Sequence, residues 1–383
     1  MRLAAVATTL LIVASIGLYK LCFPLRMTVD CLELLRFGQL IAAGKVPYVD
    51  VIHAFNPPAI QYLNVLPAVL SRLSGIHVIP SLIFCVWLLC LYSAVASIAA
   101  LRGSVLRERA VVPIAILSVS AAILPLCKLL FFGQREMLLV LCFLPFFWLR
   151  WIRWQGGSSG TLKATIIGTI AGIGLCLKPH FLLLPLCTEL YWIAKVRSIR
   201  QFSRAEIAAC AGVGLIYLAH FCLWTPDMRQ EFFGVIVPLA LGGYSIPAPA
   251  ATLSFSCHTY QFWLTILTAS LAVVLYRRCS MFGPLLAFTC GGLLVYFFQY
   301  KPYLYHLSAF YAGGTMLLAC ELCVIASLLV RAGESNPASM HQPGGCAKGL
   351  SILTAFCLGL AVLAFAVSFA KLSGDRTSAI ANG

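Results

Sequence analysis

Long apolar segments recur from one end of the chain to the other, separated by short polar stretches. Each holds about twenty residues, enough to cross a hydrocarbon core roughly 30 Å thick as a helix. The pattern predicts an all-α fold, with residues 1–383 forming a single integral membrane domain of about ten or eleven transmembrane helices. The expected spans are residues 4–24, 78–101, 110–131, 137–152, 161–177, 180–195, 205–224, 261–276, 280–299, 306–330 and 349–370.

Basic residues are concentrated in the short connections that follow alternate spans. An N-terminus in the cytoplasm would put them in inner loops, as the positive-inside rule requires. We therefore expect a multi-pass protein of the cell inner (cytoplasmic) membrane. The inner basic residues would be Arg102, Arg107, Arg109, Arg150, Arg153, Lys163, Lys195, Arg197, Arg200, Arg204, Arg277 and Arg278.

The composition agrees with this class, because 61% of the residues are hydrophobic and only 10% are charged. A soluble domain carries about 25% charged residues. The net charge of +15 at first invites a nucleic-acid partner. However, the cations lie in short loops between apolar spans and form no continuous basic surface, so the lipid bilayer is the expected partner and nucleic acid is not.

Two outer connections are long, residues 25–77 and 225–260. Within the first, an apolar pattern from Leu32 to Ala43 and an Asn-Pro-Pro start after it predict two amphipathic helices at the membrane surface. The second is rich in Pro, Ala and Ser over residues 242–259. That segment is open to two interpretations, a lid over an acceptor site or an unstructured connection.

Acidic residues are scarce, and six of the twelve map to the outer side. Asp30 is the most interesting, since it lies where the chain leaves the first span. Glu33 follows within an amphipathic helix, where a negative charge near the N-terminus is favourable for dipole reasons alone. The six are Asp30, Glu33, Asp50, Glu136, Asp227 and Glu231.

Three short outer turns each carry a cation, in the sequences FFGQRE at 131–136, LKPHF at 177–181 and FFQYKPYLYH at 297–306. Any one of Arg135, Lys178 and Lys301 could simply extend to the membrane interface. Three together, beside an apolar bundle, are what a lipid-linked phosphate would need. Tyr305 and His306 in the third turn are further candidates for contact with that phosphate.

The seventeen cysteines fall almost entirely within apolar spans or at their ends, where Cys behaves as a small hydrophobic residue. Cys31 and Cys257 lie in outer loops, and their pairing is left open because sequence gives no distance between them. No Cys or His spacing indicates a structural zinc.

The first outer loop, with an acid after the first span, a helix, GKVPYVD and then NPPAIQYL, resembles membrane glycosyltransferases of the GT-C fold. The three turns look like outer-loop motifs of bacterial members of that superfamily, which includes dolichyl-phosphate-mannose protein mannosyltransferases and aminoarabinose transferases. The resemblance implies that Asp30 is the base or orients the acceptor. It implies that Glu136 helps to hold a divalent metal or the acceptor, and that Asp50 is the acid of the Pro-Tyr-x-Asp stretch.

The resemblance implies inverting transfer of a sugar from a polyprenyl-phosphate donor, on the periplasmic or exterior face, to a glycan, lipid or protein acceptor. GQRE stands where an acidic pair could, so metal dependence is left open. A transporter or lipid flippase is the alternative, and a non-catalytic assembly partner a second one. Transporters usually carry ionisable groups near the midplane. Here the acids within spans are Glu189, which we expect to pair with Lys195, and Glu321.

Overall fold

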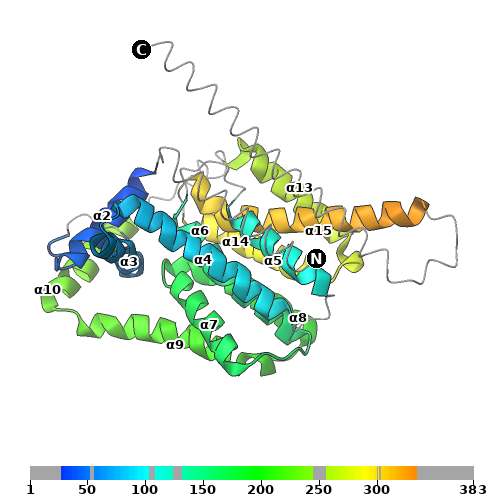
Figure 1. Cartoon of the computed structure of the whole chain (residues 1–383), viewed down its shortest axis with the longest axis horizontal. Helices are drawn as coiled ribbons and strands as arrows, with labels where there is room; N and C mark the ends of the chain where they lie inside the picture. The colour runs from blue at the N-terminus through cyan, green and yellow to red at the C-terminus, as the bar shows by residue number, and fades with distance from the viewer. Residues whose placement is uncertain are drawn as a thin grey trace, which may run out of the picture. The chain divides into compact units, whose positions relative to one another are not determined.

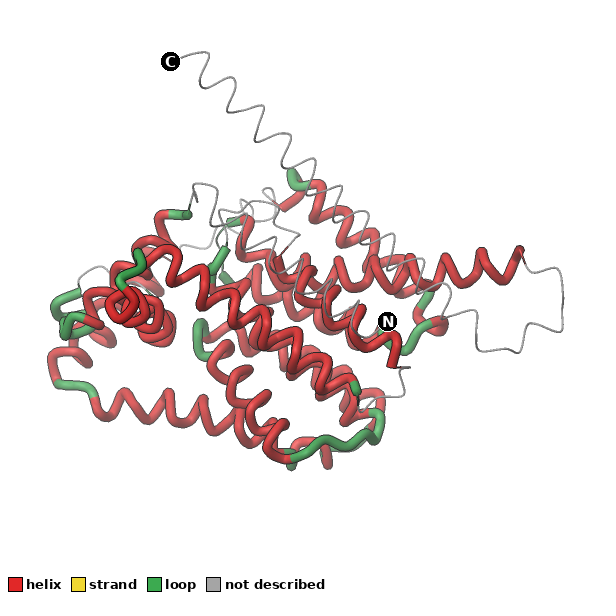
Figure 2. Tube along the Cα trace, viewed as in Figure 1, coloured by secondary structure: helices red, strands yellow, loops and turns green. Residues whose placement is uncertain are grey.

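The structure, a computed structural model, describes residues 27–51, 56–102, 108–123, 132–244, 256–299, 301 and 303–333. In this part of the chain every regular secondary-structure element is a helix (Figure 2). The one β interaction there is an isolated bridge between Pro47 and Val51. The prediction of an all-α fold is confirmed. The predicted spans 4–24 and 349–370 lie outside the described residues.

The chain forms two compact units, residues 1–317 and 318–383. The boundary falls within α15 (Ser308–Gly333), and the single-domain organisation stays a prediction. All contacts discussed below belong to the first unit.

Among the described residues, four helical stretches are long and apolar enough to cross a membrane, judged by length and composition. They are α4 (Val78–Leu101), α6 (Arg135–Trp154), α9 with η4 (Ala205–Leu223), and the first part of α15 with η8 (Leu304–Ile325). The shorter apolar helices are Ile114–Ile123 within α5 (Glu108–Ile123), α7 (Thr161–Leu175), α13 (Tyr260–Val274) and α14 (Phe282–Phe297). The predicted span 180–195 corresponds to α8 (Leu183–Val196).

Both helices expected in the first long connection are present (Figure 1). The first, α2 (Val29–Ala42), begins at Thr28, whose hydroxyl accepts from the Cys31 backbone N–H at 3.3 Å and so caps the helix. The second, α3 (Pro58–Ser74), starts with proline in its first turn and ends at Gly75, whose φ of 71° is left-handed. Local capping residues therefore fix where each helix begins or ends.

Helix α6 is the core of the described bundle, since all twenty of its residues are buried. It packs against α4, α5, α7 and α8 (Figure 1). A helix that is apolar on all sides has to be covered on all sides. Its polar residues are confined to its two ends, Arg135 and Glu136 at the start and Arg150 and Arg153 near the finish.

The contacts between helices place the connections at two opposite ends of α6. At its N-terminal end, Glu136 contacts Lys178, which follows α7. At its C-terminal end, Arg150 contacts Glu189, midway along α8, and the Gln201 carbonyl oxygen in the connection after α8. Lys163 near the start of α7 donates to Ala99 O near the end of α4. The basic connections and the three motif turns thus lie at opposite ends, as the alternating topology requires. Which end faces the cytoplasm stays a prediction.

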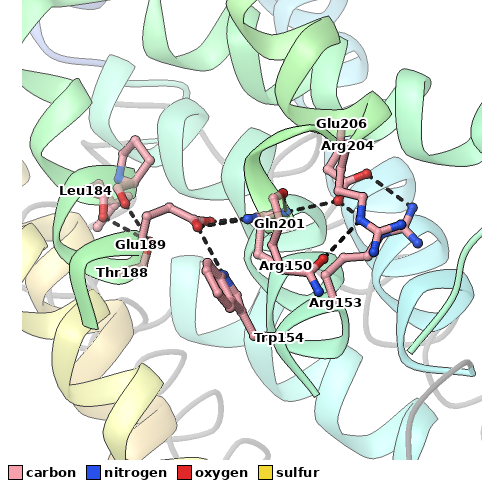
Figure 3. A network of polar contacts seen from close by, with 10 residues as sticks. Arg150, Arg153, Trp154, Leu184, Thr188, Glu189, Gln201, Arg204 and Glu206 are labelled. Atoms are coloured by element: carbon pink, nitrogen blue, oxygen red, sulfur yellow. Dashed lines mark hydrogen bonds and ion pairs between the residues drawn. The ribbon is translucent and has the colours of Figure 1, made fainter. Parts of the chain in front are cut away.

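At the C-terminal end of α6, Arg150 donates to both oxygens of Glu189, at 2.6 and 2.9 Å, and to Glu206 at 3.2 Å (Figure 3). Arg153 donates to both oxygens of Glu206, at 3.0 and 3.3 Å, and Trp154 donates to Glu189 at 3.0 Å. We call these five residues the arginine network. The expected pairing of Glu189 with Lys195 is wrong, because the guanidinium of a neighbouring helix occupies both of its oxygens.

The partner of Arg153 is fixed by close helix packing. A side chain at Gly168 in α7 would put a Cβ only 2.1 Å from the Glu206 carbonyl oxygen in α9. Glycine therefore lets the two backbones approach closely, as small residues do at membrane-helix interfaces. This approach brings the start of α9 to the end of α6.

The second long connection, for which we predicted no helix, is helical over its first half. Thr225 accepts from Met228 N at 3.3 Å and caps α10 (Pro226–Arg229), which has proline in its first turn. The chain continues through the π-helix η5 (Gln230–Ile236), α11 (Val237–Leu239) and η6 (Ala240–Tyr244). The Thr-Pro-Asp sequence is a helix-start signal that could have predicted this. Residues 245–255, most of the proposed lid, lie outside the described residues.

Candidate functional site

Four segments that are far apart in sequence meet at the N-terminal end of α6. They are the first turn of α2, the turn before α6, the turn after α7, and the segment that joins α14 to α15. Six of the predicted site residues are linked there by side-chain contacts. Arg135 is linked to the others through its contact with Asp30. We call this group the turn cluster: Asp30, Arg135, Glu136, Lys178, Tyr305 and His306.

Asp30 lies at the open side of the turn cluster, with 42% of its side chain exposed. Its Oδ2 accepts from the Tyr305 hydroxyl at 2.8 Å and lies 4.0 Å from Arg135 Nη2. Thr28, two residues before Asp30, accepts from Gln134, which ties the start of α2 to the turn before α6. Asp30 is thus held in place from two directions while its carboxylate stays accessible to a ligand.

Glu136 and Lys178 form the buried side of the turn cluster. Lys178 Nζ donates to Glu136 Oε1 at 2.5 Å and to Gln299 Oε1 at 2.5 Å. His306 Nε2 lies 3.6 Å from the same Glu136 oxygen. The carboxylate therefore balances the charge of a lysine that would otherwise be buried alone, which is the usual condition for burying a cation.

The third motif turn contributes a ring stack and a backbone contact. Tyr303 and Tyr305 stack with centroids 5.5 Å apart, and the His306 ring packs edge-on against Tyr305 at 4.5 Å. His306 Nδ1 lies 3.2 Å from the Lys301 carbonyl oxygen. Lys301 thus meets the turn cluster through its backbone, and the role of its ammonium group stays a prediction.

Burial changes the charge state of the second motif turn. Desolvation, and then the nearby charge of Arg135, lower the pKa of Lys178 to about 8, although Glu136 opposes this. Desolvation and the charge of Lys178 lower the pKa of His180 to about 4. At neutral pH, Lys178 is therefore charged but close to its midpoint, and His180 is neutral.

Several buried polar atoms around the turn cluster have no hydrogen-bond partner among the described residues. Buried polar groups are nearly always paired, by protein, water or ligand. Such a concentration at one place therefore marks a site with unused binding capacity. The atoms are Arg135 Nε, Glu136 Oε2, Gln134 Oε1, His180 Nε2 and Gln299 Nε2.

Asp50 is not among the residues brought together here. Its carboxylate accepts from the Val46 backbone N–H at 2.8 Å and closes its own exposed turn. The neighbouring Tyr48 is buried, with φ of 67°, and packs on Trp224 and Phe232. The Pro-Tyr-x-Asp stretch therefore holds the first long connection against the second. The catalytic role of Asp50 stays a prediction.

Three residues of the site were not predicted, Thr28, Gln134 and Gln299, and His180 was noted only as an outer histidine. All are neighbours of predicted residues, and three of them belong to the quoted turns GQRE, LKPHF and FFQYKPYLYH. The signal was thus present in the motifs, but uncharged residues there look like ordinary turn formers. Cys31 and Cys257 are both free thiols, and Cys31 Sγ lies 4.0 Å from Phe132 O.

The site does not fit a metal ion. Among the described residues no group of three or more His, Cys, Asp or Glu side chains is placed to hold one. Within the turn cluster, Asp30 Oδ2 is taken by Tyr305 and Glu136 Oε1 by Lys178.

No known protein family and no curated protein sequence matches the chain. Among solved structures, it is similar to the Archaeoglobus fulgidus oligosaccharyltransferase, crystallised with an acceptor peptide containing the NVT sequon tethered to it through a disulfide bond. The identity is 15% and the TM-score 0.46, over 94% of this chain and 55% of that one. The chain thus spans about half the length of that protein. At this degree of likeness, function has to be argued from the site itself.

Proposed function

We propose that this protein is a membrane glycosyltransferase that moves a sugar from a polyprenyl-phosphate donor to an acceptor, with inversion at the anomeric carbon. The observation that carries the proposal is the turn cluster. One accessible carboxylate, Asp30, lies beside two buried cations, Arg135 and Lys178, at the end of a bundle of apolar helices. A lipid-linked sugar phosphate needs these groups in this setting.

The reaction needs one base and stabilisation of one new charge. Asp30 accepts the proton of the acceptor hydroxyl, whose oxygen forms a bond to the anomeric carbon. The bond from that carbon to the phosphate oxygen breaks, and its electron pair stays on the phosphate, which gains one negative charge. Displacement from the face opposite the leaving group inverts the anomeric centre.

The remaining residues of the turn cluster support these two tasks. Lys178 and Arg135 stabilise the charge that develops on the departing phosphate, an effect that is strong where water is excluded. Glu136 holds Lys178 in place through the 2.5 Å contact. Tyr305 donates to Asp30 and orients its carboxylate toward the acceptor.

The decisive experiment offers the purified full chain, in proteoliposomes, a panel of radiolabelled polyprenyl-phosphate sugars. Because the acceptor is unidentified, slow transfer of the sugar to water serves as the first readout. We expect the sugar to be released with inverted configuration. A transporter or flippase would instead move the intact donor or another solute across the membrane, and that outcome with no sugar release would contradict the proposal.

We also propose that the turn cluster faces the periplasm or exterior of the inner membrane. Gly44 and Gly156 are matched reporters, since both are exposed glycines in turns, with φ of 87° and 83°. A protease site inserted at Gly44 should be cut from outside in intact cells. One inserted at Gly156 should be cut only after the membrane is opened, and the reverse pattern would place the site in the cytoplasm.

A further inference from the structure

Lys178 has binding capacity that the protein itself does not use. An ammonium group has three N–H donors. One is directed to Glu136 and one to Gln299, both at 2.5 Å. The third has no acceptor among the described residues, although Lys178 is 8% exposed.

Two uncharged side chains beside Lys178, Gln299 and His180, also carry a nitrogen that has no hydrogen-bond partner among the described residues. Gln299 uses its carbonyl oxygen for Lys178, and its buried Nε2 has no partner among the described residues. His180, two residues after Lys178, faces Gln299, and its Nε2 is also buried and unpaired in the described part of the chain. An amide nitrogen only donates, and a neutral imidazole carries one donor. The unused donors of Lys178 and Gln299 and the unpaired Nε2 of His180 therefore belong to side chains that contact one another.

The charges of the turn cluster cancel. Lys178 is opposed by Glu136, and Arg135 by Asp30, so two cations meet two carboxylates. With His306 neutral, the formal charges of the six turn-cluster side chains sum to zero. Such a site cannot hold a ligand by excess positive charge, and each further negative charge brought into it remains uncompensated, which is costly in a buried place.

We infer that Lys178, Gln299 and His180 form the phosphate subsite of the donor, and that they select a phosphodiester with one negative charge over a diphosphate. The selection rests on hydrogen bonds from one charged and two neutral donors rather than on net charge. This inference rests on the proposed function, and it adds Gln299 and His180 as direct ligands of the phosphate.

The experiment uses two probes with the same lipid tail, dodecyl methyl phosphate and dodecyl diphosphate. Their binding to the detergent-purified full chain is measured by microscale thermophoresis at neutral pH. We expect the phosphodiester to bind at least about tenfold more tightly, as one uncompensated charge in a buried site is worth more than about 1.4 kcal/mol. Its affinity should also change little between low and high salt, since no excess charge attracts it.

Gln299→Leu should weaken phosphodiester binding by roughly ten- to a hundredfold, the usual loss when a hydrogen bond to a charged group is removed. Gln299→Glu should weaken it at least as much, because a carboxylate would occupy the place beside Lys178. Gln201→Leu is the matched control, since that glutamine bonds Arg204 at 3.0 Å at the opposite end of α6. If the leucine variant does not fold, the glutamate variant and His180→Phe supply the same comparison.

The inference is overturned if dodecyl diphosphate binds as tightly as the phosphodiester, or if the folded Gln299 and His180 variants keep wild-type affinity. These outcomes are separable from failure of the proposed function. Sugar transfer that does not depend on Gln299 would contradict the phosphate subsite and support the glycosyltransferase function. Selective phosphodiester binding without sugar release from any donor would support the subsite and contradict the glycosyltransferase function.

Discussion

The two ends of α6 bury ionic groups of the same chemistry and treat them differently. In the arginine network, both oxygens of Glu189 and both of Glu206 accept hydrogen bonds, so the network is closed. In the turn cluster, Arg135 Nε and Glu136 Oε2 have no partner among the described residues. The closed group holds α6, α8 and α9 together. The open group has capacity left for a ligand, and this difference separates a structural ion-pair network from a candidate active site.

The largest expected effect is on catalysis at the open end. Asp30→Asn keeps the shape of the side chain but cannot accept a proton, so sugar transfer should fall by about 10²–10⁴-fold. Thermal stability should stay close to that of the wild type, because Asp30 is partly exposed. Glu33→Gln is the control, an exposed acid in the same helix. Equal activity of the two variants would remove Asp30 from the role of base.

A substitution in the arginine network should lower thermal stability and leave catalysis unchanged. Arg150→Met removes the cation paired with Glu189 and leaves that buried carboxylate only its bond from Trp154, which should destabilise the protein by about 3–5 kcal/mol. The measurement is the thermal midpoint in detergent, followed by transfer activity per folded molecule at low temperature. We expect activity per folded molecule to be unchanged. Loss of activity without loss of stability would show that the two ends do not differ as described.

The pH dependence tests the charge state of Lys178. A lysine is charged below its pKa, and here the pKa is lowered to about 8. Binding of dodecyl methyl phosphate should therefore weaken as pH rises through about 8, by up to about tenfold per pH unit. Lys178→Arg stays protonated and should show no such inflection.

The free energy of unfolding should change with pH in the opposite direction to ligand binding. Between pH 8 and the unfolded pKa of 10.5, the unfolded chain binds the proton more readily than the folded one, so this group's contribution to the free energy of unfolding rises with pH. Wild type should therefore gain stability relative to Lys178→Met across that window. A pH-independent difference between the two proteins would contradict the shift.

The smallest effect should come from the residue that orients Asp30. Tyr305→Phe removes the 2.8 Å bond to Asp30 and keeps the ring. One hydrogen bond contributes about 1 kcal/mol, so transfer should fall roughly fivefold, mainly in kcat. Tyr303→Phe is matched to it, since Tyr303 stacks on the same ring and is more exposed. Equal losses in the two variants would assign the effect to the ring stack.

Local features of the chain could be predicted because local residues cause them. The helices follow from apolar runs, and the start of α2 follows from Thr28 with Asp30 in the first turn. The basic connections and the motif turns alternate along the sequence, so their separation to opposite ends of α6 could also be predicted. The Thr-Pro-Asp start of α10 is a local signal of the same kind.

Only the tertiary structure decided which of these elements meet. Tyr305 and Asp30 are 275 residues apart, and Lys178 and Gln299 are 121 apart. Periodicity fixes which face of a helix is apolar but not which helix covers it, because apolar faces are interchangeable in a bundle. For this reason the partner of Glu189 was predicted wrongly. The unused donor of Gln299 could not be foreseen, since a hydrogen-bond vacancy is defined only once every neighbour is in place.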